Sequence, residues 1–108
     1  MATAESRNTL GADAVFRRRV RTIALASAYD ITAATLPGSP TAAELARRAF
    51  SARLLQARDT QLTDRIAELM AAKLPDAQVD AAGGPSDAQL TTAMPIAIDA
   101  LGNVAAAS

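Results

Sequence analysis

The chain has 108 residues, which is the usual size of a single domain. It contains neither Cys nor His, so thiol and imidazole chemistry, disulfides and Cys/His zinc sites are excluded, and a metal would find only carboxylate ligands. The 11 Lys and Arg balance 11 Asp and Glu, so the net charge demands no polyanionic partner. Half of the residues are hydrophobic, mostly Ala, which favours helices but buries little area. We therefore expect an all-α fold, a small bundle of three to four helices.

The charges are divided unevenly along the chain. Residues 1–54 carry eight basic and four acidic side chains, whereas residues 55–108 carry three basic and seven acidic ones. Such asymmetry steers a partner of either sign, or lets the basic half of one copy meet the acidic half of the next. The alternative is that these charges cover solvated helix faces.

A polar N-terminal arm is expected over residues 1–11, followed by a long helix. Asp13 is the predicted N-cap, and the helix should run to about Thr35. Its core stripe is predicted from side chains three and four residues apart: Phe16, Val20, Ile23, Ser27, Ile31 and Ala34. Two prolines and a glycine in residues 36–40 then end the helix in a tight connection.

A second helix is predicted to begin at Thr41, because Thr41 and Glu44 form a capping-box pair. It should run to about Arg58, with a break near Asp59 and Thr60. The side chains expected to face inward are Leu45, Ala46, Ala49, Phe50, Leu54 and Ala57. Those expected in water are Arg47, Arg48, Arg53 and Arg58.

The third helix has the clearest periodicity in the chain and is predicted to end at Pro75. Its apolar positions follow helical spacing: Leu62, Ile66, Leu69, Met70 and Leu74. Residues 76–85 contain Ala-Ala-Gly-Gly-Pro and two acids, so a flexible loop of that length is expected here.

The last helix should open with a second capping box, formed by Ser86 and Gln89. Its predicted stripe consists of Leu90, Met94, Ala97, Ile98 and Leu101. Pro95 removes a hydrogen bond to the Thr91 carbonyl, so it should kink this helix or split it in two. Gly102 and Asn103 are typical helix-stop residues. The expected organisation is thus an arm over 1–11, a helical domain over 12–102 and a tail over 103–108.

Four arginines, at positions 17, 18, 19 and 21, form the one concentrated charge cluster. Four guanidinium groups in five helical residues wrap about half of the circumference, where they can contact phosphate or the carboxylates of a neighbouring protein. Plain solvation of these groups is the third possibility. A DNA-binding domain is normally basic overall, which this chain is not.

No motif predicts catalysis. Asp64 and Glu68 share a helix face near Asp59, but nothing in the sequence buries them and Arg65 lies beside them, so a surface role is favoured over acid/base work or metal binding. Tyr29 is the single phenol, and a lone Tyr usually packs. We expect no enzymatic activity, no cofactor and no metal. The longest apolar stretch, residues 23–29, is too short to span a membrane, and the polar start does not resemble a secretory signal.

Three segments of the chain resemble a group of small Ala-rich helical structural proteins of tailed bacteriophages. These are Phe-Arg-Arg-Arg-Val at 16–20, Ala-Arg-Arg-Ala at 46–49, and Ser-Asp-Ala-Gln-Leu at 86–90 continuing to Asp-Ala-Leu at 99–101. The resemblance covers residues 13–102, with Pro95 as a departure from the common outline. It implies a virion structural role in the head, the neck that joins head to tail, or the capsid surface, without catalysis.

The expected function is therefore that of a structural subunit whose partners are other copies of itself and other virion proteins, assembled in the cytoplasm of a bacterial host. The residues expected at interfaces are Arg17, Arg18, Arg21, Leu25, Leu36, Leu55 and Ile96. The alternative is a small nucleic-acid-associated regulatory protein that uses the arginine cluster. A third possibility is an adaptor module that binds one partner helix.

Overall fold

The architecture is all-α. The structure is a computed structural model that describes residues 4–57, 60–81 and 84–107, and within them it contains six helices and no strand. The helices are α1 (Ala4–Ala12), α2 (Ala14–Ala33), α3 (Ala42–Gln56), α4 (Gln61–Lys73), α5 (Asp76–Asp80) and α6 (Asp87–Ala107). The four longest correspond to the expected helices, whereas α1 and α5 were not expected, so the predicted number of three to four is wrong.

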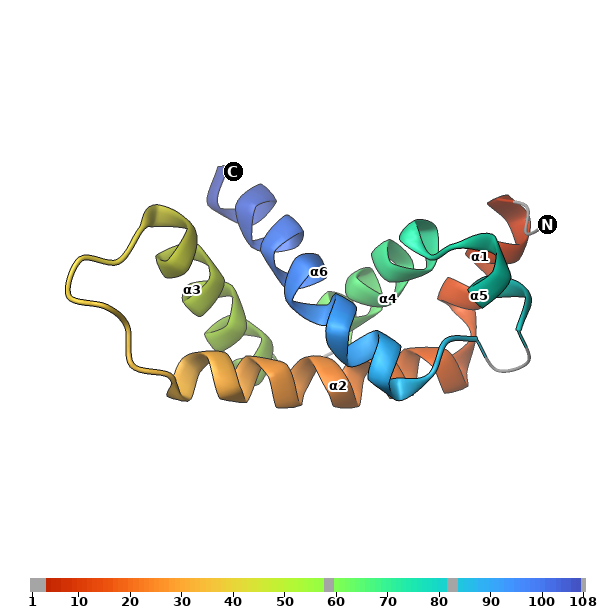
Figure 1. Ribbon diagram of the computed structural model, residues 1–108, viewed down its shortest axis with the longest axis horizontal. Coiled ribbons are helices and arrows are strands. Elements are labelled where there is room, and N and C mark those ends of the chain that lie inside the picture. Colours follow the sequence, from red (N-terminus) through yellow and green to blue (C-terminus); the bar gives the residue numbers. More distant parts are fainter. Residues whose placement is uncertain (1–3, 58–59, 82–83, 108) are drawn as a thin grey trace.

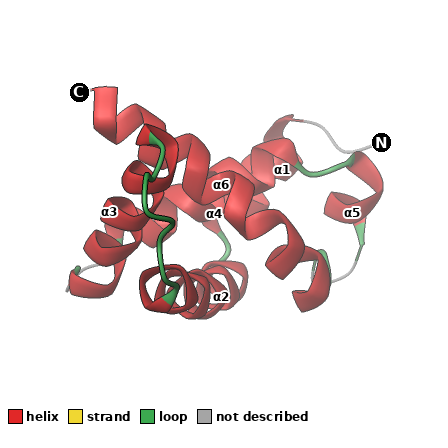
Figure 2. Cartoon of the chain, turned by 60° about the vertical axis from the view of Figure 1, so that its left-hand side comes forward, coloured by secondary structure: helices red, strands yellow, loops and turns green. Residues whose placement is uncertain are grey.

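Helix α2 forms the base of the fold, and α3, α4 and α6 all pack against it. Figure 1 shows α2 along the longest axis of the molecule, and Figure 2 shows it nearly end-on with the other helices to one side. Helix α3 packs against α6, while α1 packs against α4 at the opposite end. The molecule is elongated, with extents of 46 × 28 × 25 Å.

The predicted stripe of α2 is partly wrong. Phe16 and Val20 are buried as expected, but the stripe continues through Ala24 and Ala28, every fourth residue. The remaining expected members are half-buried or, at the C-cap, exposed: Ile23, Ser27, Ile31 and Ala34. The physical reason is that α2 must accommodate three helices along one face, and small Ala side chains let them approach closely.

Helix α3 begins with the predicted capping box, since Thr41 and Glu44 satisfy each other's backbone amides. Phe50 and Leu54 are buried as predicted, and Ser51, which was not expected there, lies beside them on the buried face. Leu45 and Ala49 are exposed, and Ala46 and Ala57 are half-buried. Arg47 and Arg48 are not simply in water, because both are half-buried and hydrogen-bonded to other elements, whereas Arg53 is exposed as predicted. Arg58 and Asp59 lie outside the described residues.

Helix α4 follows the predicted pattern. Ile66 and Met70 are buried, Leu74 is buried at the C-cap, and Leu62 and Leu69 pack half-buried against the core. Thr60 is the N-cap residue by position, although its side chain makes no capping hydrogen bond to the backbone.

The segment expected to be a loop over residues 76–85 contains the short helix α5. Residues 4–11 of the expected polar arm are also helical, and α1 places Leu10 against the core and buries Gly11 against α4. Neither helix has an apolar stripe of its own, so each forms through contacts with the rest of the fold.

Helix α6 opens with the predicted capping box, in which Gln89 N donates to Ser86 Oγ at 3.2 Å and Ser86 N donates to Gln89 Oε1 at 2.8 Å. Pro95 lies inside the helix without splitting it. The predicted stop at Gly102 and Asn103 is wrong, since the helix continues to Ala107 and includes most of the expected tail. Gly102 is buried where α6 crosses α3, and its missing side chain lets α6 approach Phe50 and Ala46.

Candidate docking surface

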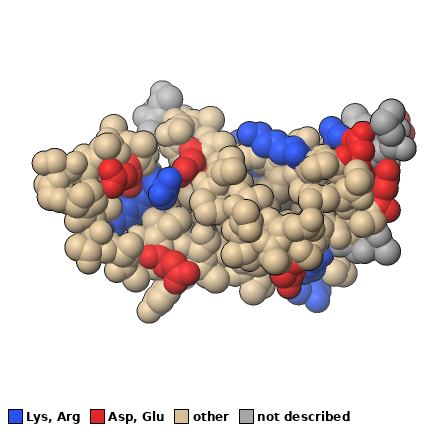
Figure 3. Space-filling model, in the orientation of Figure 1, with Lys and Arg blue, Asp and Glu red and all other residues tan. Residues whose placement is uncertain are grey.

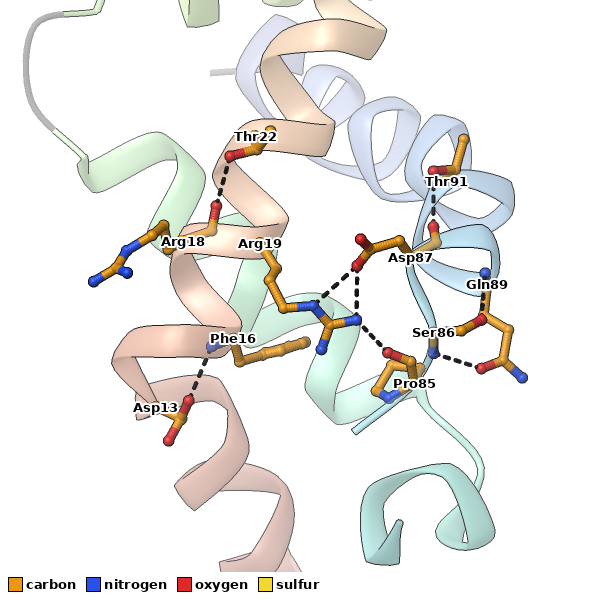
Figure 4. Close-up of polar contacts among 10 residues, drawn as sticks. All are labelled: Asp13, Phe16, Arg18, Arg19, Thr22, Pro85, Ser86, Asp87, Gln89 and Thr91. Carbon is orange, nitrogen blue, oxygen red and sulfur yellow. Dashed lines mark hydrogen bonds and ion pairs between the residues drawn. The ribbon is translucent and has the colours of Figure 1, made fainter. Parts of the chain in front are cut away.

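The arginine cluster is divided between internal contacts and solvent. Arg19 extends from α2 to the start of α6, where Nε and Nη2 donate to Asp87 Oδ1 at 2.9 and 2.8 Å and Nη2 also donates to the Pro85 carbonyl at 2.5 Å. Figure 4 shows this guanidinium between Asp87 and Pro85, beside the Ser86–Gln89 capping box. The contact fixes the first turn of α6 against α2.

Arg17 is also engaged within the chain, although it was expected at an interface. Its Nε donates to the Gly11 carbonyl at 2.8 Å, and its Nη atoms lie 3.5 Å from Asp64 Oδ2 and 3.9 Å from Glu68 Oε1. These two carboxylates are the pair considered above for acid/base work or metal binding. Here they pair with Arg17 and hold α4 against α2.

Two further ion pairs join distant segments. Arg47 and Asp99 form a two-pronged pair between α3 and α6, with both N–O distances 2.7 Å. The hydrogen bond to Asp99, together with the attraction of that carboxylate, raises the pKa of Arg47. Arg7 of α1 pairs with Asp76 of α5.

These pairs explain the uneven charge along the sequence. Each of them joins an arginine from residues 1–54 to one or two acids from residues 55–108. The asymmetry expected to guide one copy toward the next is thus largely used to fold the chain back on itself. In Figure 3 positive and negative groups lie next to each other toward both ends of the face that it shows.

Arg18 and Arg21 differ from their neighbours. The Arg18 side chain is exposed and that of Arg21 is half-exposed, and neither makes an ion pair or a side-chain hydrogen bond within the described residues. Of the cluster, these two guanidinium groups are the ones available to a partner.

A groove lies between the C-terminal end of α4, α5 and the outer face of α6, with a volume of about 590 Å³. Its apolar walls include Leu69, Leu74, Ala93 and Ile96, and its polar lining comes from Lys73, Gln78, Gln89 and Thr92. Ile96 is 65% exposed. An exposed large apolar side chain beside an apolar depression is typical of a protein-binding surface.

Of the predicted interface residues, only Ile96 lines this groove. Leu25 and Leu36 are half-buried on α2 and in the following connection, and Leu55 on α3 is 41% exposed. The predicted set is therefore spread over several surfaces. Lys73, Leu74 and Ala93 were missed, although the lack of any charged residue from Ala88 to Ile98 was a usable signal for this face.

A second cavity of about 590 Å³ is polar and is lined by Arg53, Arg65, Asp64 and Glu68, among others. Its acids already face Arg17. Among the described residues, no group of three Asp and Glu side chains is placed to hold a metal ion. None of the helices in this part of the chain combines the length and the apolar character needed to cross a membrane.

Comparison with known proteins gives no relative: no family model matches the chain, and neither does any curated protein or solved structure. The candidate site therefore rests on the geometry of the chain itself.

Proposed function

We propose that this protein is a non-enzymatic structural subunit that acts through contacts with other chains. The supporting observation is its large surface. The accessible area is 6546 Å² for a mass of 11.1 kDa. A folded monomer of that mass is expected to expose about 5650 Å² by the scaling of area with mass. The chain thus exposes roughly 900 Å² more than a typical monomer of its mass.

The excess area has a structural cause. The molecule is elongated, and large apolar side chains protrude from several of its helices, with Val15, Tyr29 and Ile96 each at least 60% exposed. A small helical domain that is rich in Ala has little other apolar area with which to stabilise itself. Contacts with other chains would cover this surface.

The more specific proposal is a component of a tailed-phage virion, in the head, the neck or the head–tail connection, with other copies and other virion proteins as partners. It rests on the resemblance of residues 16–20, 46–49 and 86–90. In the fold, Arg19 of the first segment binds Asp87 of the third, and Ala46 of the second lies against Gly102 of α6. Each of the three segments thus contributes a residue to a contact between helices, which is compatible with a structural role.

The test reverses the charge of the two available arginines in the double variant Arg18→Glu/Arg21→Glu. We expect helical circular dichroism to be unchanged, because neither side chain holds another element, and particle assembly to be lost in cells that supply only this variant. Arg65→Glu is the control, since Arg65 is an exposed cation on α4. Normal particles from the double variant would contradict a role of the arginine cluster in assembly.

The alternative, a nucleic-acid-associated protein, is supported by the same two free guanidinium groups. Two phosphate contacts predict that the logarithm of the binding constant falls with the logarithm of salt concentration with a slope of about −2. A salt-titrated assay with duplex DNA measures this slope. Absence of binding at low salt would exclude the alternative.

A further inference from the structure

The outer face of α6 is an uncharged surface in the middle of the molecule. Ala88, Thr92 and Ile96 follow one another at intervals of four residues, and all three are exposed. No charged residue occurs from Ala88 to Ile98. In Figure 3 the centre of the visible face is free of charged groups, which lie around it. This face borders the groove between α4, α5 and α6.

The surface carries a projection and a depression side by side. Ile96 protrudes from α6, and the groove that it borders is walled by Leu69, Leu74 and Ala93. When both features lie on one patch, two identical patches fit each other about a two-fold axis, because each copy supplies the side chain that the other copy receives. A different partner would need to supply both features separately.

We infer that the occupant of this groove is a second copy of the chain. The two α6 helices lie antiparallel across a two-fold axis near Thr92 and Ile96, and Ile96 of each copy enters the groove of the other. This inference rests on the proposed function, and it identifies one contact between copies through which that function would work.

The charges at the ends of this face are compatible with such pairing. Asp87 and Asp99 flank the uncharged stretch, and each is bound by an arginine of its own chain, Arg19 and Arg47 respectively. Two copies can therefore approach without bringing unpaired carboxylates together.

The first experiment compares two variants of the full chain by light scattering after size-exclusion chromatography. Ile96→Glu replaces the apolar side chain that enters the groove with a carboxylate, which loses its hydration against Leu69, Leu74 and Ala93 although Lys73 also lines the groove. We expect the dissociation constant of the dimer to rise at least ~100-fold. Val15→Glu is the matched control, because Val15 is similarly exposed, at 60%, but lies on α2. A dimer that persists unchanged in Ile96→Glu would overturn the inference.

A second experiment reports geometry instead of affinity. The chain has no Cys, so Thr92→Cys introduces a single thiol close to the proposed axis. We expect mild oxidation to convert it into a covalent dimer at least ~10-fold faster than Val15→Cys. Equal rates for the two variants would contradict the antiparallel arrangement of α6.

The outcomes separate this inference from the proposed function. If the wild-type chain forms larger oligomers that Ile96→Glu leaves intact, the inference fails and the structural role stands. If Ile96→Glu abolishes binding to a different virion protein while the wild type is monomeric, the groove binds another chain and the inference again fails. A wild type that is a dimer by itself, and a monomer when Ile96 is replaced, supports it.

Discussion

Both faces of α6 are uncharged between Ala88 and Ile98, but they lie in opposite surroundings. On the inner face, Leu90, Met94 and Ile98 are completely buried. On the outer face, Ile96 is 65% exposed and Ala88 and Thr92 are exposed, again without a charge between Ala88 and Ile98. In a helical domain, one apolar face on each helix is enough to form the core. The second uncharged face therefore points to contact with something outside the fold.

The largest expected difference between the faces comes from the same substitution two residues apart. Ile98→Ala removes buried methylene and methyl groups and should lower the free energy of unfolding by about 3 kcal/mol. Ile96→Ala should change it by less than about 0.5 kcal/mol, since the side chain contacts mostly water in the monomer. Urea denaturation of both variants, at concentrations low enough for monomers, measures the contrast. Similar losses would show that the faces are not distinct.

The crossing of α6 and α3 gives the next largest effect. A Cβ atom at Gly102 would lie 3.4 Å from Phe50 Cβ, which is ordinary contact. Gly102→Ala should therefore be tolerated and should stabilise the helix by up to about 1 kcal/mol. Gly102→Leu cannot fit without separating the helices and should cost about 1–3 kcal/mol. Thermal unfolding of the two variants checks the opposite signs, and a stabilising Leu would argue against this close crossing.

Two buried hydroxyl groups should respond in opposite directions. Ser51 Oγ is buried without a hydrogen-bond partner among the described residues, whereas Thr63 Oγ1 donates to the Thr60 carbonyl at 3.0 Å. Ser51→Ala removes an unsatisfied polar group and should stabilise the protein by about 1 kcal/mol. Thr63→Val removes a hydrogen bond and should destabilise it by about 1 kcal/mol. Chemical denaturation tests both, and a destabilised Ser51→Ala would mean that this hydroxyl is bonded.

The ion pair between α3 and α6 should have the smallest effect. A double-mutant cycle with Arg47→Ala and Asp99→Ala should give a coupling of about 0.5–1 kcal/mol, because both side chains are more than one third exposed and therefore screened. The coupling should fall as salt is added. The raised pKa of Arg47 means that its charged form is favoured by folding. The arginine contribution is thus present at neutral pH and is lost only as pH rises through that pKa, in strongly alkaline solution. A coupling that is insensitive to salt would contradict this account.

The parts of the fold that depend on local chemistry were predictable. Thr41 with Glu44 and Ser86 with Gln89 cap their helices as their spacing indicates, and α4 follows its apolar period. Elements that depend on distant partners were not predictable. Helix α1 needs contacts with α4 and the pairing of Arg7, and Gly102 stays helical because it packs on α3.

The candidate site was predictable only in part for the same reason. Ile96 was identified because it lies off the buried stripe of α6. The walls of its groove come from α4 and α5, and no sequence spacing connects those helices with α6. The arginine cluster was visible in the sequence, but its division was not. The sequence could not distinguish Arg17 and Arg19, which bind within the chain, from Arg18 and Arg21, which do not within the described residues.

The most direct test of the central claim is sedimentation equilibrium of the wild-type chain over a wide range of concentration. If the outer face of α6 is covered by a second copy, the apparent mass should rise from 11.1 kDa toward twice that value and then level off. A mass that stays at 11.1 kDa up to millimolar concentration would contradict the claim.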